Sequence, residues 1–203
     1  MNFFNRLDKY ASNTAIITEK SEHVSYMDLL SFADTIGKKI ENRSLVFAIC
    51  NNSFESIAGY IGLIRSGAVL FLIHNSIHNT ILHNLLDLFN PKYVYLPSNE
   101  SDLVIKGLVI YSTTNYTLLK TNYNIDYDLH AELALLLATS GSTGKPKLVK
   151  QSYKNIYSNA NSIAKYLSIT SDDRAITTMP MSYSYALSIL NSHLLKGASI
   201  ILN

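Results

Sequence analysis

The feature that most constrains the fold of this chain is the regular alternation of apolar runs and amphipathic segments between residues 45 and 96. The apolar runs suit strands that are buried on both faces: Leu45–Cys50, Val69–Ile73 and Tyr93–Leu96. The intervening segments, Phe54–Ser66 and Thr80–Phe89, carry apolar residues at helical spacing, and a glycine closes the first while a proline follows the second. Strand, helix, strand, helix, strand predicts βαβ units and a mostly parallel sheet.

The rest of the chain extends this pattern. Ser25 is expected to cap a helix that continues through about Asn42, and Ser152 one that continues through about Leu167. The other expected elements are strands at Leu108–Tyr111, Leu133–Ala138, Lys147–Gln151, Ala175–Thr178 and Ser199–Leu202, and a helix at Ala186–Leu195. The polar, turn-like segment 122–130 is the expected place for a subdomain boundary. The predicted fold class is α/β.

Composition excludes several classes of protein. Hydrophobic residues make up 47% of the 203 residues and charged residues 16%, which is a globular balance. The net charge of +2 and the lack of a Lys/Arg-rich stripe argue against a nucleic-acid partner. Because no apolar stretch is long enough to cross a bilayer and no secretory segment is recognised, we expect no membrane partner and a cytoplasmic location. The single cysteine, Cys50, lies in an apolar run and is expected to be buried.

The last residues form an apolar strand, Ser199–Leu202, with neither a turn nor a polar tail behind it. Termini are usually polar and exposed. We therefore expect the natural sequence to continue past Asn203, so that the chain is an N-terminal fragment.

The segment Leu135–Gln151 reads LLLATSGSTGKPKLVKQ and carries the strongest chemical signal. Two glycines, Gly141 and Gly144, permit positive φ and a close approach of the backbone to a ligand. Successive backbone N–H groups in such a turn form a concavity that binds anions, and the neighbouring hydroxyls and lysines add donors and positive charge. The pattern predicts a phosphate-binding loop between two strands.

A Walker A loop and a solvated surface turn are the two other interpretations of this segment. A Walker A loop needs G-x-x-x-x-G-K-[ST], whereas these glycines are three residues apart and Pro146 occupies the Ser/Thr position. This makes a P-loop phosphotransferase a poor match. A bare Gly-Ser-Thr-Gly stretch is more often a solvated surface turn, but the longer string around it is far more specific.

The full string, from Leu136 through Thr139-Ser140-Gly141-Ser142-Thr143-Gly144 to Pro146-Lys147, resembles the phosphate-loop signature of the adenylate-forming superfamily. This superfamily includes acyl-CoA synthetases, adenylation domains of peptide synthetases and luciferases. Further segments resemble the same family in the correct order: Ser25-Tyr26-x-x-Leu29, Gly62 to Gly67-Ala68, and Met179-Pro180 to Tyr185. The resemblance covers essentially all 203 residues, as the N-terminal part of the family's large domain, and implies layered helices and mostly parallel sheets with an incomplete second sheet.

The resemblance implies an AMP-forming carboxylate ligase. Such an enzyme joins a carboxylic or amino acid to the α-phosphate of Mg²⁺-ATP and then passes the acyl group to coenzyme A or to the phosphopantetheine of an acyl or peptidyl carrier protein. The family's adenine site, ribose site and C-terminal catalytic lysine would lie beyond this chain. The fragment alone is therefore expected to be inactive or nearly so.

The resemblance implies a functional role only for those residues that match the family's motifs. Lys147 is the matched loop lysine and is expected to assist the departure of pyrophosphate, while Lys145 occupies a variable position. The other expected ATP-binding residues are Thr139, Ser140, Gly141, Ser142, Thr143 and Gly144. Tyr183 and Tyr185 are expected to border the acyl pocket, although Tyr183 replaces the histidine of many acyl-CoA ligases; packing in the core is the alternative for both rings.

No metal site is expected in the chain itself. His74, His78 and His83 straddle a loop and a helix start, and no cysteine or carboxylate cluster joins them. A non-catalytic module that binds nucleotide or phosphate remains the alternative from a different functional class.

Overall fold

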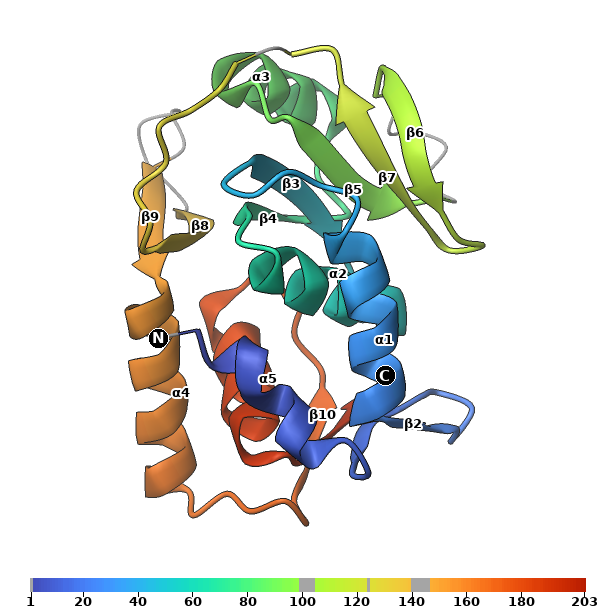
Figure 1. Ribbon diagram of the computed structural model, residues 1–203, viewed down its shortest axis with the longest axis vertical. Helices are drawn as coiled ribbons and strands as arrows, with labels where there is room; N and C mark the ends of the chain where they lie inside the picture. The colour runs from blue at the N-terminus through green and yellow to red at the C-terminus, as the bar shows by residue number, and fades with distance from the viewer. Residues whose placement is uncertain (1, 99–104, 124, 140–146) are drawn as a thin grey trace.

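The computed structural model describes residues 2–98, 105–123, 125–139 and 147–203, and it shows a layered α/β architecture (Figure 1). The strands are β1 (Thr14–Ile17), β2 (His23–Ser25), β3 (Leu45–Cys50), β4 (Val69–His74), β5 (Tyr93–Pro97), β6 (Gly107–Ser112), β7 (Tyr116–Thr121), β8 (Leu133–Thr139), β9 (Lys147–Ser152), β10 (Arg174–Thr177) and β11 (Ser199–Leu202). The helices are the 3₁₀ helix η1 (Phe3–Tyr10), α1 (Tyr26–Gly37), α2 (Phe54–Arg65), α3 (Asn79–Phe89), α4 (Tyr153–Tyr166) and α5 (Ser184–Lys196).

A seven-stranded sheet, in the order β6-β7-β5-β3-β4-β8-β9, forms one layer. Its centre is parallel, because β5, β3, β4 and β8 all run in the same direction, whereas β7 and β9 pair antiparallel to their neighbours. The four-stranded sheet β10-β11-β1-β2 forms a second layer, and only β2 is antiparallel there. The α/β prediction with mostly parallel sheets is confirmed.

Two hydrophobic cores lie on opposite faces of the large sheet. Side chains at alternate positions of β3, such as Phe47 and Ile49, pack with α3 on one face. The other positions, such as Val46 and Ala48, pack with α1, α2 and α5, which lie between the two sheets. Helices α2 and α3 thus cover opposite faces of the large sheet. The chain moves in one direction across the sheet from β3 to β4 and in the other direction from β4 to β5, and right-handed crossovers then place the two helices on opposite faces.

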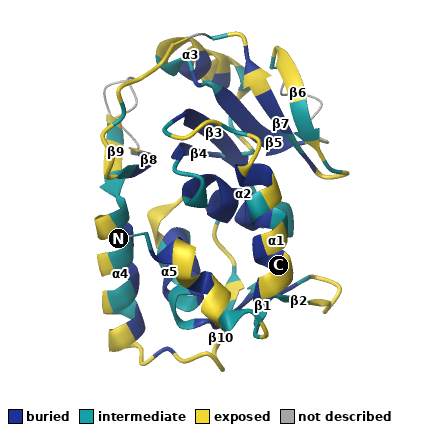
Figure 2. Ribbon diagram, in the orientation of Figure 1, coloured by how far each residue is buried: buried dark blue, intermediate teal, exposed yellow. Residues whose placement is uncertain are grey.

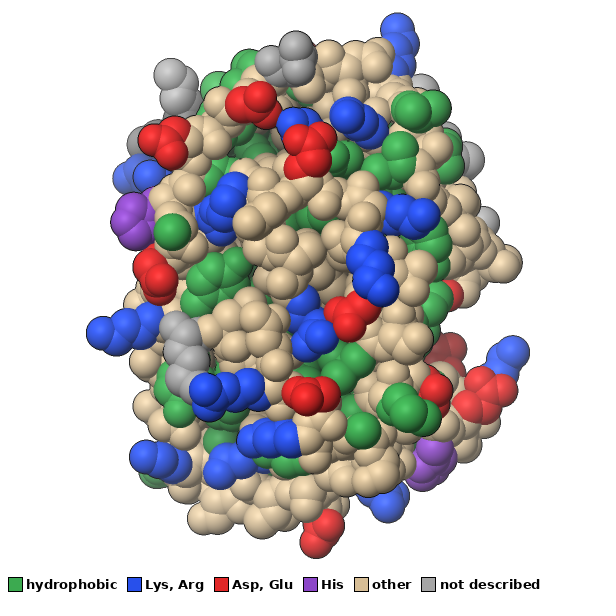
Figure 3. Space-filling model, in the orientation of Figure 1, with side chains coloured by type: hydrophobic (Ala, Val, Ile, Leu, Met, Phe, Trp, Pro, Cys, Tyr) green, Lys and Arg blue, Asp and Glu red, His purple; other side chains and the backbone are tan. Residues whose placement is uncertain are grey.

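The exposed residues are concentrated on the outer faces of the helices and on β6 and β9 (Figure 2). On the face in Figure 3, Lys and Arg side chains are spread widely, with Asp and Glu side chains between several of them. In the described ranges, no helix combines the length and the hydropathy that a membrane span needs.

Three of the predicted helix starts are confirmed by capping side chains. Ser25 Oγ accepts a hydrogen bond from the Asp28 N–H, and Ser53 Oγ accepts one from the Ser56 N–H. Ser152 begins α4 with a capping box, in which its own side chain and that of Asn155 exchange hydrogen bonds with the backbone.

The structure differs from the sequence predictions in several places. Helix α1 ends at Gly37 rather than near Asn42, since the chain turns back and Arg43 adopts a left-handed φ of 57° just before β3. The sequence does not predict strand β7, because its residues show no clear alternation. Its extended conformation depends on the hydrogen bonds that it forms with β5 and β6. Strand β1 was also missed; it is four residues long and pairs with β11, with Ile16 opposite Ile200. Segment 122–130 connects β7 to β8 within one sheet, and the proposed boundary there stays a prediction.

Helices α1 and α2 approach so closely that only glycine fits at their contact. A Cβ added to Gly62 would lie 1.9 Å from the carbonyl oxygen of Ala33, and one added to Gly37 would lie 2.6 Å from the carbonyl oxygen of Gly62. Backbone atoms cannot move aside as a flexible side chain would. The close contact therefore depends on both glycines.

We expect Gly62→Ala to lower the free energy of unfolding by about 1–3 kcal/mol, the usual cost of overpacking a core. Urea denaturation followed by circular dichroism measures the change. Ser31→Ala on the exposed side of α1 is the control and should stay within about 0.5 kcal/mol of the parent chain. Equal stability of the two variants would show that the helix contact can relax without cost.

Candidate functional site

The candidate site lies at the carboxyl edge of the parallel strands. Register brings Cys50 of β3 beside His74 of β4, and Leu72 of β4 beside Leu137 of β8, so the ends of these strands reach the same edge of the sheet. In open α/β sheets, ligands bind in the crevice outside this edge, where crossovers leave in opposite directions.

The β8–β9 hairpin carries the predicted phosphate loop to this edge. Thr139 is the last residue of β8, and it pairs with Lys147, the exposed first residue of β9. The loop between two strands that the sequence predicted is thus confirmed in its two flanks. The predicted ligand residues Ser140, Gly141, Ser142, Thr143 and Gly144 lie outside the described residues.

One arginine fixes the beginning of β8. The guanidinium of Arg43 donates to the carbonyl oxygens of Gly67 (3.1 Å) and Leu133 (3.0 Å) through Nη1. Its Nη2 donates to the carbonyl oxygens of Leu129 (3.4 Å) and His130. A planar, multidentate donor is suited to join backbone segments from different parts of the chain. Arg43 therefore ties the start of the hairpin to the turn that precedes β4.

The segment after β10 also reaches the carboxyl edge. Asn52, in the turn after β3, donates from Nδ2 to the Thr177 carbonyl oxygen at 3.4 Å. Its Oδ1 and the Oγ of Ser182 are buried and have no hydrogen-bond partner among the described residues. Buried polar atoms usually have a partner, which can be water or a ligand. These two atoms are therefore candidates for a ligand contact that the sequence did not indicate.

Tyr183 lies against His74 at the end of β4, with the ring centroids 6.5 Å apart. The Nδ1 atom of His74 accepts a hydrogen bond from the Ser76 N–H at 3.1 Å. Tyr183 is 55% exposed and Tyr185, in the first turn of α5, is 66% exposed. Neither ring is packed in the core of this chain, and their place at an acyl pocket stays a prediction.

The three histidines do not form a metal centre. Among the residues that the structure describes, no group of three or more His, Cys, Asp or Glu side chains is arranged to hold a metal ion. Cys50 is also unsuited to nucleophilic chemistry. Burial raises the pKa of its thiol to about 12, and the Sγ hydrogen points to the Ile73 carbonyl oxygen at 3.3 Å.

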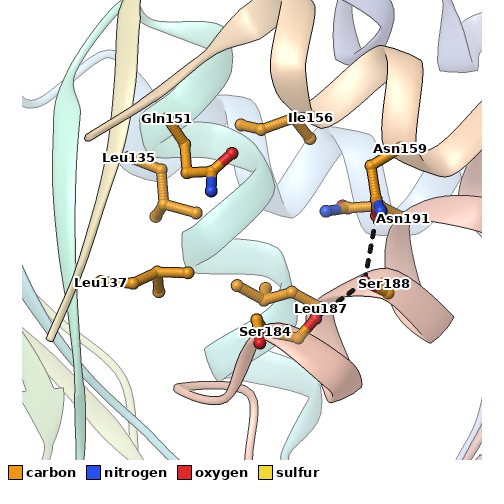
Figure 4. Close-up of a pocket in the computed structure, with 9 residues that line it drawn as sticks. All are labelled: Leu135, Leu137, Gln151, Ile156, Asn159, Ser184, Leu187, Ser188 and Asn191. Carbon is orange, nitrogen blue, oxygen red and sulfur yellow. Dashed lines mark hydrogen bonds between the residues drawn. The ribbon is translucent and has the colours of Figure 1, made fainter. Parts of the chain in front are cut away.

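A pocket of about 140 Å³ opens beneath the hairpin, between β8, β9, α4 and α5 (Figure 4). We call it the hairpin pocket. Its lining combines apolar and uncharged polar side chains: Leu135, Leu137, Gln151, Ile156, Asn159, Ser184, Leu187, Ser188 and Asn191. The polar members come from three elements, and no local sequence pattern indicates that they meet. The helical spacing of Ser184, Ser188 and Asn191 is compatible with a common face of α5.

The described structure is an open, mostly parallel α/β sheet whose β8–β9 hairpin ends at the carboxyl edge. A family model described as "AMP-binding enzyme" matches residues 3–203. The chain belongs to the AMP-binding enzyme family, and the resemblance stated from the sequence is confirmed.

Relatives found by sequence similarity include ligases. A 2-succinylbenzoate–CoA ligase from Bacillus cereus is 28% identical over 196 residues, which cover 93% of this chain and 40% of the ligase. The chain thus spans less than half of that relative.

Solved structures show the same fold. Apo MatB from Rhodopseudomonas palustris aligns with a TM-score of 0.80 at 22% identity, covering 98% of this chain and 44% of MatB. MenE from Bacillus subtilis, solved in complex with AMP, aligns with a TM-score of 0.75 at 18% identity over all of this chain and 55% of MenE.

The Arg43 contacts predict a large effect on stability from a single side chain. We expect Arg43→Met to lower the free energy of unfolding by about 3 kcal/mol, because several partly buried carbonyl groups lose a charged donor. Arg43→Lys should recover only part of this loss, since an ammonium group cannot reproduce the planar fork. Chemical denaturation measures both variants, and Arg6→Met, at an exposed position of η1, is the matched control. Equal stability of the Arg43→Met and Arg6→Met variants would contradict this role.

Proposed function

We propose that this chain is part of an AMP-forming carboxylate ligase. The observation that carries the proposal is the string Thr139 to Lys147, whose two ends are held by a hairpin at the carboxyl edge of the parallel strands. Family membership and the name of the ligase relative support the same reaction class.

The proposed reaction has two steps. An oxygen of the substrate carboxylate attacks the α-phosphorus of ATP, and the bond from that phosphorus to the bridging oxygen breaks, giving an acyl-adenylate and pyrophosphate. A thiolate sulfur then attacks the acyl carbon, and AMP leaves. The first step needs negative charge to be stabilised on the departing pyrophosphate, which is a matter of positioning and electrostatics.

In this proposal the loop binds the β- and γ-phosphates. Lys147 would place its ammonium group on the departing pyrophosphate, and backbone N–H groups and hydroxyls would come from Thr139, Ser140, Gly141, Ser142, Thr143 and Gly144. Mg²⁺ would enter with ATP, because in such sites it is held largely by phosphate oxygens and water. The exposed Tyr183 and Tyr185 would border the acyl group.

The acyl acceptor is proposed to be coenzyme A, in keeping with the name of the 2-succinylbenzoate–CoA ligase relative. The phosphopantetheine of a carrier protein presents the same thiol and remains the second possibility. The acid is a small carboxylic or amino acid, and a cytoplasmic location stays a prediction.

ATP–pyrophosphate exchange tests the first step in the full-length natural protein. We expect exchange that depends on one class of acid and falls by about 10²-fold or more in Lys147→Ala, the usual effect of losing one preorganised charge-stabilising donor. The matched control is Lys150→Ala, an exposed lysine on the same strand, which should change exchange less than about twofold.

The two contrary outcomes have different meanings. If no acid of a broad panel supports exchange while nucleotide still binds, the chain belongs to a non-catalytic nucleotide-binding protein. If exchange occurs but is equally reduced by both lysine substitutions, the ligase reaction stands and the specific role of Lys147 is wrong.

A further inference from the structure

We propose that the hairpin pocket receives the tail of the acid substrate, and that this tail is short, uncharged and able to form hydrogen bonds. This inference rests on the proposed ligase function. The inference adds a substrate class to that function: carboxylic acids that carry a hydroxyl or carboxamide group at the end of a chain of a few carbons.

The pocket begins where the chemistry would occur. Leu137 lies two residues before Thr139 on β8, and Ser184 directly follows Tyr183. These two pocket residues lie at one end, whereas Ile156 and Asn159 lie at the other (Figure 4). A carboxylate placed beside the Thr139–Lys147 pair would therefore extend its tail past Leu137 and Ser184 toward helix α4.

The pocket offers a fixed hydrogen-bond donor. The side chain of Asn191 is only 5% exposed, and its Oδ1 accepts a hydrogen bond of 3.2 Å from the Tyr60 hydroxyl, which is itself buried. Burial raises the pKa of Tyr60, so this phenol stays protonated and continues to donate. This bond orients the Asn191 amide with its oxygen toward Tyr60, so that the Nδ2 hydrogens are available to a ligand acceptor.

The pocket also offers an acceptor. The Ser188 hydroxyl lies 3.0 Å from Asn159 Oδ1 and 2.8 Å from the Ser184 carbonyl oxygen. The Ser184 carbonyl oxygen is also the acceptor of the Ser188 N–H within α5, whereas Asn159 Oδ1 has a second lone pair that remains for a donor on the ligand. Donor and acceptor together match a hydroxyl or carboxamide group, which can both give and receive hydrogen bonds.

Charge and size exclude other tails. None of the described residues that line the pocket is charged, so a second carboxylate or an ammonium group would be desolvated without an opposite charge. The pocket measures about 140 Å³, which suits a tail of a few carbons with a terminal polar group.

The experiment compares acids of matched shape in ATP–pyrophosphate exchange with the full-length protein. The first pair is 5-hydroxypentanoate and hexanoate, and the second is the monoamide of glutarate and glutarate itself. We expect kcat/KM to favour 5-hydroxypentanoate over hexanoate by roughly tenfold, because an apolar tail leaves buried polar groups of the pocket unpaired. The monoamide should be favoured over glutarate by at least as much, and decanoate should be a poor substrate.

Substitutions assign the preference to the pocket. Asn159→Leu and Ser188→Ala should each reduce the preference for 5-hydroxypentanoate over hexanoate about fivefold or more. Asn161→Leu, on the same helix but outside the pocket lining, is the matched control and should leave the ratio unchanged. Thermal denaturation of each variant verifies that it is folded.

Each outcome decides a separate point. Exchange that favours hexanoate, decanoate or glutarate overturns the proposed substrate class and leaves the ligase function intact. A preference for 5-hydroxypentanoate that neither pocket substitution changes overturns the role of the pocket. Absence of exchange with every acid, in a protein that is folded and binds ATP, overturns the ligase function and this inference with it.

Discussion

Burial of helix α2 is the constraint on which the rest of the structure depends. Every residue from Ser56 to Ile64 is buried, because the helix lies between the large sheet and α1. A helix that is apolar on all sides must be covered on all sides. The glycine contact with α1 brings that helix close enough to cover one side, and alternate residues of β3 and β4 cover another. The layers therefore stack in one order around α2.

The candidate site follows from this arrangement. Strands β3 and β4 hold the centre of the sheet, β8 joins β4 on the free side, and Arg43 fixes where β8 begins. The hairpin consequently delivers Thr139 and Lys147 to the edge at which β3 and β4 also end. The segment before α5 reaches the same edge. Asn52 donates a hydrogen bond to the Thr177 carbonyl oxygen there, and the Tyr183 ring lies beside the His74 ring. The Thr139–Lys147 pair, the segment before α5 and the hairpin pocket lie near one another because two sheets share one layer of helices.

Much of this could be predicted from sequence, for identifiable reasons. Buried parallel strands such as Leu45–Cys50 are continuous apolar runs, and a capping serine or a closing glycine marks a helix end with local chemistry. The loop string carried enough specific positions to indicate the family. The hairpin pocket could not be predicted, because Gln151, Asn159 and Asn191 are individually ordinary polar residues on three different elements. His74 was considered only as a metal ligand, since nothing local indicated its contact with Tyr183.

By itself, the sequence determined most of the elements, the α/β class and the family, because each of these depends on residues close together in the chain. The tertiary structure alone decided which distant residues meet. It paired β1 with β11 across about the whole length of the chain, placed Asn191 against Tyr60, and brought the two tyrosines to the surface beside the sheet edge. These contacts depend on how two sheets close around shared helices, and hydrophobic burial is non-directional, so no local pattern specifies them.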